Sequence, residues 1–91
     1  MARVKVFLYA SVREAAGVPS IEVEASDLRS LVDSLKAKSS PALARLLDES
    51  IRDPDRLVVL VNGRNVGRTD PKKVKLTDMD EIALFPPVSG G

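Results

Sequence analysis

The sequence lacks the side chains on which most enzyme mechanisms depend. Its 91 residues include no cysteine, no histidine and no tryptophan. Without cysteine there is no disulfide, no thiolate nucleophile and no thiolate metal site. Without histidine the chain has neither the usual general base nor the commonest metal ligand. This inventory excludes triad-type catalysis, and we expect no metal site and no catalytic side chain.

Long apolar runs and a one-sided charge are missing as well. No run approaches the roughly 20 apolar residues of a membrane-spanning helix. The chain starts with Met1-Ala2-Arg3-Val4-Lys5 and enters a strand pattern at once, without a signal peptide, so we expect it in the cytoplasm. The formal net charge of +1 gives no argument for nucleic-acid binding. We therefore expect neither nucleic acid nor membrane among its partners.

The residues that are present suit a small globular protein. Hydrophobic residues make up 44% of the chain and charged residues 30%, which is the usual balance for one domain with one core. We assign residues 1–86 to this domain. Residues 87–91 are predicted to form a flexible C-terminal tail that ends in Gly-Gly.

Hydrophobic patterning predicts about five strands. Apolar side chains alternate with others at 3–9, at 20–25 and again at 81–85. A continuous apolar run at 57–61 predicts a strand that is largely covered on both faces. The Asn62-Gly63 pair that follows it is typical of a tight hairpin turn, with a short returning strand at 64–67.

Two helices are predicted between the second and third strands. The first has apolar residues at helical spacing from Leu28 to Leu35 and begins after Ser26 or Asp27 as the N-cap. Ser40-Pro41 starts a second helical segment that runs to about residue 51. The stretch 11–17, by contrast, is too short for a helix of its own and is predicted to be a loop with one helical turn.

This order of elements predicts an α+β fold. Two strands, a helical crossover and three more strands form a mixed sheet of about five strands with the helices packed on one face. The crossover places the first and last strands side by side, parallel, in the middle of the sheet. This arrangement is the β-grasp, or ubiquitin-like, architecture.

The three aromatic residues, Phe7, Tyr9 and Phe85, fall on the strands predicted to be central. If Ile82 and Leu84 point into the core, Phe85 points the other way, together with Phe7 and Tyr9. An apolar cluster on a sheet face that is not covered by helices indicates a docking surface. The alternative is that the parity is reversed and the aromatic rings belong to the core.

Two charged stretches are interpreted as solvated surface. Five cations lie close together against a single acid, Asp70, in a segment without interleaved aromatic residues: Arg64, Arg68, Lys72, Lys73 and Lys75. A second group near the end of the second helix mixes Arg52 and Arg56 with four acids: Asp48, Glu49, Asp53 and Asp55. It lacks the spacing and central glycine of a cation-binding loop.

The tail offers chemistry of its own through its terminal carboxylate. Pro86 and Pro87 end the last strand and stiffen the exit from it. Val88, Ser89 and Gly90 are slim enough to pass through a narrow channel in a partner protein. The carboxylate of Gly91 is a poor electrophile until AMP is transferred to it from ATP. A sulfur donor then converts the mixed anhydride to a thiocarboxylate, and an amine converts it to an amide.

Four segments of the chain resemble the MoaD-type sulfur carriers, the small subunits of molybdopterin synthase within the ubiquitin-like sulfur carriers. The matching segments span the chain and are Phe7-Leu8-Tyr9-Ala10-Ser11-Val12-Arg13-Glu14-Ala15-Ala16-Gly17, Asn62-Gly63, Leu76-Thr77-Asp78-Met79-Asp80-Glu81-Ile82 and Leu84-Phe85-Pro86-Pro87-Val88-Ser89-Gly90-Gly91.

The resemblance implies a non-catalytic subunit that donates sulfur. Gly91 would be adenylated by a ubiquitin-activating-type adenylyltransferase, which uses ATP, and loaded by a sulfur donor protein. The carrier itself would bind no cofactor. The tail would then enter the large synthase subunit, which holds the catalytic residues, and pass sulfur to a pterin precursor. Partners would meet the face around Phe85, extended to Phe7 and Arg13 and to Pro86 and Pro87.

Three alternatives remain open from the sequence. The chain could be a ubiquitin-like modifier joined through Gly91 to lysines, a sulfur carrier for thiamine synthesis or tRNA thiolation, or an interaction module with an idle tail. The second helical segment favours the molybdopterin carriers over the shorter thiamine ones.

One departure from the family pattern is Met79, where the family usually has a glycine suited to positive φ, so a turn of another type is predicted there.

Overall fold

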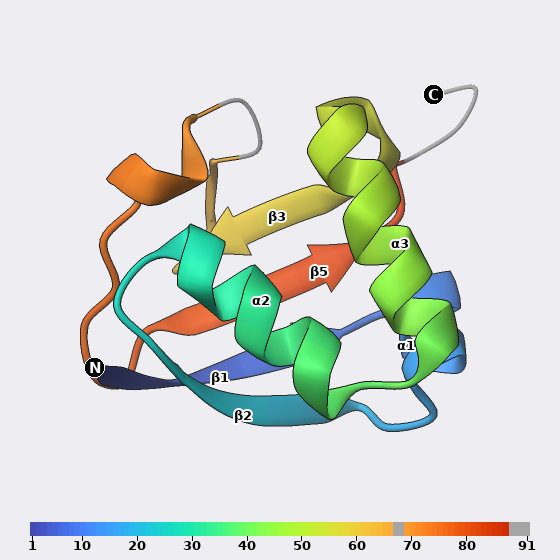
Figure 1. The fold of residues 1–91 in the computed structure, drawn as a ribbon, viewed down its shortest axis with the longest axis horizontal. Helices are drawn as coiled ribbons and strands as arrows, with labels where there is room; N and C mark the ends of the chain where they lie inside the picture. Colours follow the sequence, from blue (N-terminus) through green and yellow to red (C-terminus); the bar gives the residue numbers. More distant parts are fainter. Residues whose placement is uncertain (67–68, 88–91) are drawn as a thin grey trace.

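The core of the protein lies between a five-stranded sheet and a layer of helices (Figure 1). A computed structural model describes residues 1–66 and 69–87, without the side chains at positions 51 and 54. The elements in chain order are β1 Ala2–Leu8, α1 Ala10–Ala16, β2 Ser20–Ala25, α2 Leu28–Lys38, α3 Pro41–Arg52, the 3-10 turn η1 Pro54–Arg56, β3 Val58–Val61, β4 Arg64–Asn65, the 3-10 turn η2 Pro71–Lys73 and β5 Glu81–Phe85.

The sheet has the strand order β2-β1-β5-β3-β4. Strands β1 and β5 are parallel, and the other three neighbouring pairs are antiparallel. Helices α2 and α3 lie on one face of the sheet, and α1 lies at the end where β1 stops (Figure 1). The predicted β-grasp fold is therefore confirmed, with the last strand in the centre beside the first.

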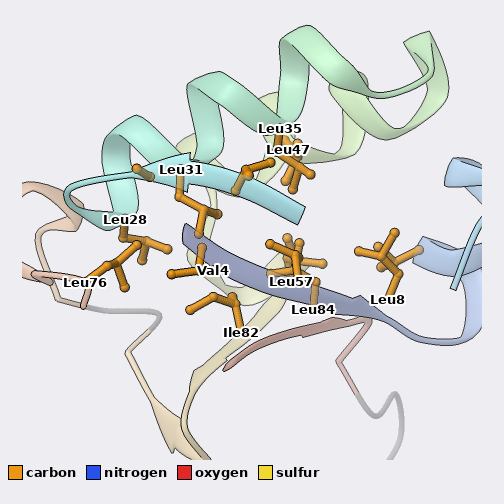
Figure 2. Close-up of a cluster of buried hydrophobic side chains, with 14 of the residues drawn as sticks. Val4, Leu8, Leu28, Leu31, Leu35, Leu47, Leu57, Leu76, Ile82 and Leu84 are labelled. Atoms are coloured by element: carbon orange, nitrogen blue, oxygen red, sulfur yellow. The ribbon is translucent and has the colours of Figure 1, made fainter. Parts of the chain in front are cut away.

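Strand alternation decides which side chains enter the core. In β1 the residues Ala2, Val4, Val6 and Leu8 are buried, whereas Arg3 and Lys5 are exposed. Ile82 and Leu84 of β5 are buried on the same side. Figure 2 shows Val4, Ile82 and Leu84 on the side of the sheet that faces the helices, which contribute leucines to the same cluster: Leu31, Leu35 and Leu47.

The two long helices begin at the predicted caps. The Asp27 side chain accepts a hydrogen bond from Ser30 N–H at 2.8 Å, while Ser30 Oγ accepts from Asp27 N–H at 3.2 Å. This reciprocal capping box satisfies two donors that have no partner within α2. At the start of α3 the Ser40 side chain accepts a single capping hydrogen bond from Leu43 N–H at 3.3 Å, and Pro41 occupies the first helical position.

Three local predictions are wrong. The first concerns the loop predicted at 11–17, because the structure has the helix α1 from Ala10 to Ala16 there. Tertiary contacts stabilise this short helix. Val12 is buried in the core, and Ser40 Oγ donates to the Ala15 carbonyl at 2.6 Å. Gly17 ends it in the left-handed conformation at φ +78°.

The second wrong prediction is the turn at Met79. Its φ is +72°, so a non-glycine residue adopts the backbone that suits glycine. The turn is closed by Asp80 N–H, which donates to the Thr77 carbonyl at 3.1 Å. Met79 N–H donates to the Arg3 backbone carbonyl at 3.2 Å. These bonds offset a strain of about 1–3 kcal/mol, and the Met79 side chain stays 89% exposed.

The third difference is the length of β4, predicted at 64–67. The strand ends at Asn65, because Val66 turns into the core and is buried. Val66 N–H still donates to the Val59 carbonyl at 3.1 Å. Residue 67 lies outside the described residues.

Candidate functional site

The sheet face turned away from α2 and α3 carries an apolar surface. Strand register places Phe7 beside Ala83, Ala83 beside Leu60, and Phe85 beside Val58. All five side chains are half-buried. None of them packs against the core cluster. With Tyr9 they form a continuous surface, which we call the aromatic face: Phe7, Tyr9, Val58, Leu60, Ala83 and Phe85.

The predicted parity of the aromatic residues is confirmed, and the alternative that they are core is wrong. Tyr9 is 48% exposed and meets Phe85 edge to face, with ring centroids 6.2 Å apart and an interplanar angle of 81°. This geometry suits the quadrupoles of the two rings. The pair stands where β5 ends, so it flanks the point from which the tail departs.

Sequence reasoning missed Val58 and Leu60. The apolar run at 57–61 was predicted to be covered on both faces, but the structure leaves these two side chains half-buried on the aromatic face. No local pattern singles them out, because the run is apolar at every position and only its pairing with β5 fixes which side chains face outward. With Val61 paired to the buried Ile82, alternation sends Leu60 and Val58 outward.

The other half of this sheet face is charged. Lys5 lies between Glu22 of β2 and Glu81 of β5 in the register, and Arg3 pairs with Glu24 at 3.7 Å. The Lys5 ammonium stands 5.2 Å from the centre of the Phe7 ring, at the boundary between the two halves. The face is therefore apolar near the tail and charged at the opposite end.

The root of the tail is held by the central strands. Tyr9 N–H donates to the Leu84 carbonyl at 3.1 Å, which extends the β1–β5 pairing beyond the end of β1. Phe85 is the last residue in register, beside Val58. Pro86 is half-buried and Pro87 is exposed. Neither has a backbone N–H, so neither continues a ladder.

The remaining predicted site residues separate into two groups. Arg13 lies on α1, exposed, at the same end of the sheet as the aromatic face. Val88, Ser89, Gly90 and Gly91 lie outside the described residues. Of the predicted contact residues, the structure places Phe7 and Phe85 on the aromatic face, and Pro86 and Pro87 directly after β5.

The two charged stretches behave as surface. Lys36 pairs with Asp48, and Arg56 pairs with Asp53 at 3.7 Å. Across residues 1–66 and 69–87, no three Asp or Glu side chains gather as a metal site would require. Lys72, Lys73, Lys75 and Arg64 are exposed, and Arg68 lies outside the described residues. No helix in the described part of the chain is long and apolar enough to cross a membrane.

An apolar cavity of about 320 Å³ lies between α2, α3, β3 and the segment that leads into η2. Its polar rim is already engaged. Arg29 pairs with Asp33 at 3.7 Å, Asp70 accepts from Lys72 N–H at 3.0 Å, and Ser50 donates to the Leu47 carbonyl at 2.7 Å. The cavity therefore resembles loose packing of the core more than a binding site with convergent polar groups.

Two carboxylates have shifted pKa values, and both stabilise turns or caps. Thr77 N–H, at 2.8 Å, and the Asn62 amide, at 2.9 Å, lower the pKa of Asp80. Ser30 N–H lowers the pKa of Asp27. Hydrogen bonds to a carboxylate favour its charged form. Both groups are thus ionised structural acceptors, which leaves the aromatic face and the tail as the candidate site.

Known proteins resemble this chain in sequence and in fold along almost its whole length. The family model described as the ThiS family matches residues 6–91. The molybdopterin synthase sulfur carrier subunit of Escherichia coli is 36% identical over 90 residues, covering 97% of this chain and 99% of that one. Small archaeal modifier protein 3 of Haloferax volcanii is 35% identical over 86 residues, covering 91% and 92%.

Solved structures show the same similarity at the level of the fold. The small archaeal modifier protein 1 of Methanosarcina acetivorans superposes with a TM-score of 0.76 at 34% identity, covering 100% of this chain and 98% of that one. Subunit 1 in the protein–protein complex of subunits 1 and 2 of the Helicobacter pylori molybdopterin-converting factor gives 0.67 at 25% identity, covering 98% and 99%. The chain belongs to the ThiS family, the sulfur carriers with a ubiquitin-like β-grasp fold.

Proposed function

We propose that this chain is the small, non-catalytic subunit of a molybdopterin synthase and carries sulfur as a thiocarboxylate on Gly91. The observation that carries the proposal is the aromatic face at the root of the tail, on a chain whose sequence follows the Escherichia coli carrier subunit from end to end. The amino-acid composition supports a non-catalytic role, since the chain has no cysteine or histidine with which to perform the chemistry itself.

The reaction on the tail proceeds through an activated acyl group. A Gly91 carboxylate oxygen attacks the α-phosphorus of ATP, and pyrophosphate leaves. A hydrosulfide equivalent delivered by a donor protein then attacks the acyl carbon, the bond from that carbon to the AMP oxygen breaks, and the products are AMP and a thiocarboxylate. An adenylyltransferase of the ubiquitin-activating type supplies the first step, and this chain binds no cofactor of its own. The thiocarboxylate then passes its sulfur to a pterin precursor inside the large subunit.

The aromatic face provides the contact with these partners. The Helicobacter pylori structure is a complex of subunits 1 and 2, which supports a second subunit as the partner here. Residues 88–91 extend at most about 14 Å beyond Pro87, so the partner must bind close to Phe85 for the carboxylate to reach its active site. Apolar side chains beside the tail root, with Arg13 nearby, meet that requirement.

A mass measurement tests the proposal. Chain purified from cells that contain the activating enzyme should carry the mass gain of one oxygen replaced by sulfur, located on the C-terminal peptide. Deleting Gly90-Gly91 should remove this gain and abolish the activity of the reconstituted synthase. Full synthase activity with the deleted chain would contradict the proposal.

A second candidate function is protein modification, favoured by the 35% identity to a small archaeal modifier protein. The activated Gly91 would then form an amide with a target lysine in place of a thiocarboxylate. Target peptides bearing a Gly-Gly remnant on lysine, lost when Gly91 is deleted, would identify this activity. A sulfur carrier for thiamine or tRNA would show the same thiocarboxylate but would not restore molybdopterin synthesis.

A further inference from the structure

The turn between β3 and β4 has a chemistry that the proposed function does not use. Asn62 and Gly63 adopt φ values of +51° and +84°, and both residues are exposed. In an Asn-Gly pair the following residue has no Cβ to shield its backbone nitrogen. That nitrogen can attack the side-chain carbonyl carbon of Asn62, which makes the pair prone to deamidation.

The native structure holds both ends of this side chain. Asn62 Nδ2 donates to Asp80 Oδ1 at 2.9 Å, and Asn62 Oδ1 accepts from Glu81 N–H at 2.9 Å. Asn62 N–H also donates to the Glu81 carbonyl at 2.8 Å. These three bonds tie the turn to the start of β5. The side-chain amide carbon cannot swing toward Gly63 unless the two side-chain bonds break.

We propose that Asn62 is a deamidation site that the fold keeps closed, and that it reacts when the turn separates from the start of β5. The Gly63 nitrogen bonds to Asn62 Cγ, the Cγ–Nδ2 bond breaks, and ammonia leaves with the proton from Gly63. Water then opens the cyclic imide at either carbonyl, which gives aspartate or isoaspartate at position 62. No oxidant or cofactor takes part.

The product disrupts the contact that had protected the amide. An aspartate at 62 replaces a donor with an anion where 2.9 Å had separated Nδ2 from Asp80 Oδ1. The Asp80 carboxylate already accepts two hydrogen bonds from Thr77, from its N–H at 2.8 Å and from its Oγ1 at 3.1 Å. Two carboxylates at this distance repel, so the lesion keeps the turn apart from β5, the strand that leads to the tail.

Deamidation of the full chain can be timed by peptide mass spectrometry with detection of isoaspartate. Near neutral pH, the folded chain should deamidate at Asn62 about tenfold more slowly than the chain in urea, because reaction requires local opening. Asp80→Ala should raise the deamidation rate of Asn62 in the folded chain several-fold. Asp78→Ala is the matched control, because Asp78 lies in the same turn but accepts from Arg3 N–H at 2.9 Å. Asn65, followed by Val66, is the internal control.

Equal rates in the folded and unfolded chains would overturn the proposal, and so would an equal acceleration by Asp78→Ala. A second measurement applies even if Asp80→Ala fails to fold. Asn62→Asp should lower the melting temperature of the chain, and the swapped pair Asn62→Asp with Asp80→Asn should recover part of the loss by restoring an amide opposite a carboxylate. A swapped pair no more stable than Asn62→Asp alone would show that the contact does not protect the turn.

Discussion

The two faces of the same sheet have opposite tasks. On the inner face Val6, Ile82 and Leu84 are buried in the core cluster between the sheet and the helices. On the outer face their immediate neighbours in sequence, Phe7, Ala83 and Phe85, remain half-buried and have no covering element among residues 1–66 and 69–87. A shift of one residue along a strand therefore separates side chains that stabilise the fold from side chains that are free to bind.

The largest effect on stability is expected from the inner face. Leu84→Ala removes a side chain that is 2% exposed at the centre of the sheet, and it should lower the free energy of unfolding by about 2–5 kcal/mol. Urea denaturation followed by circular dichroism measures this loss. A loss below that of Phe85→Ala would break the comparison between the two faces.

The largest effect on binding is expected from the outer face. Phe85→Lys should weaken binding to the large synthase subunit that we propose as the partner about thirtyfold, which is the cost of losing a central aromatic contact, while the domain stays folded. Calorimetric titration gives the affinity and circular dichroism checks the fold. Glu22→Lys, in the charged half of the same face, is the matched control and should bind nearly normally. Unfolding of Phe85→Lys would place this residue with the core instead.

Tyr9 should have a smaller effect of the same kind. Tyr9→Ala removes the edge-to-face contact with Phe85, worth about 0.5–1.5 kcal/mol in such pairs. Both stability and partner affinity should fall modestly. Tyr9→Phe keeps the ring and should match the parent chain in both measurements. A full loss in Tyr9→Phe would mean that the hydroxyl, rather than the ring, makes the contact.

Acid should reveal a further, graded loss of stability. The pKa values of Asp80 and Asp27 are lowered in the folded state by hydrogen bonds from Thr77 and Ser30. Their contribution is present above the ordinary carboxyl pKa of about 3.9 and is lost as pH falls through the lower folded-state values. Thermal melting at decreasing pH measures it. The melting temperature of Asp80→Asn should depend less steeply on pH in this range. An unchanged dependence would show that Asp80 does not contribute to the loss of stability in acid.

The smallest effect is expected at Ser39, between α2 and α3. Its hydroxyl oxygen is buried and has no hydrogen-bond partner in the described part of the chain. Ser39→Ala should change the free energy of unfolding by no more than about 0.5 kcal/mol, with stabilisation the favoured direction. Ser40→Ala, which removes the α3 cap and the bond to Ala15, is the contrasting variant and should cost about 1 kcal/mol.

Sequence reasoning succeeded where a single short-range rule governs the structure. Alternation assigned the faces of β1 and β5, and the caps Asp27 and Ser40 marked the starts of α2 and α3. The Asn62-Gly63 turn followed from two residues that tolerate positive φ. The aromatic face was predicted because parity on two adjacent strands sufficed to place Phe7 with Phe85.

The failures share a dependence on distant contacts. Helix α1 is stabilised by Val12 in the core and by Ser40, which is 25 positions from Ala15. Met79 tolerates positive φ because its N–H donates to Arg3 at the other end of the chain. Val58 and Leu60 join the aromatic face because β3 pairs with β5. No local pattern encodes these contacts. The tail residues and the boundary at 86/87 stay predictions.

The central position of β5 constrains how the protein is made. Strand β5 pairs with β1 on one side and β3 on the other, although it follows both of them in the sequence. During translation β1 and β3 cannot complete their pairing in the sheet until β5 has been made, because the contacts that stabilise distant strands form only after the loop between them has closed. The aromatic face is completed by the same strand through Phe85. A nascent chain therefore cannot offer this surface to a partner before residues 81–85 have been added.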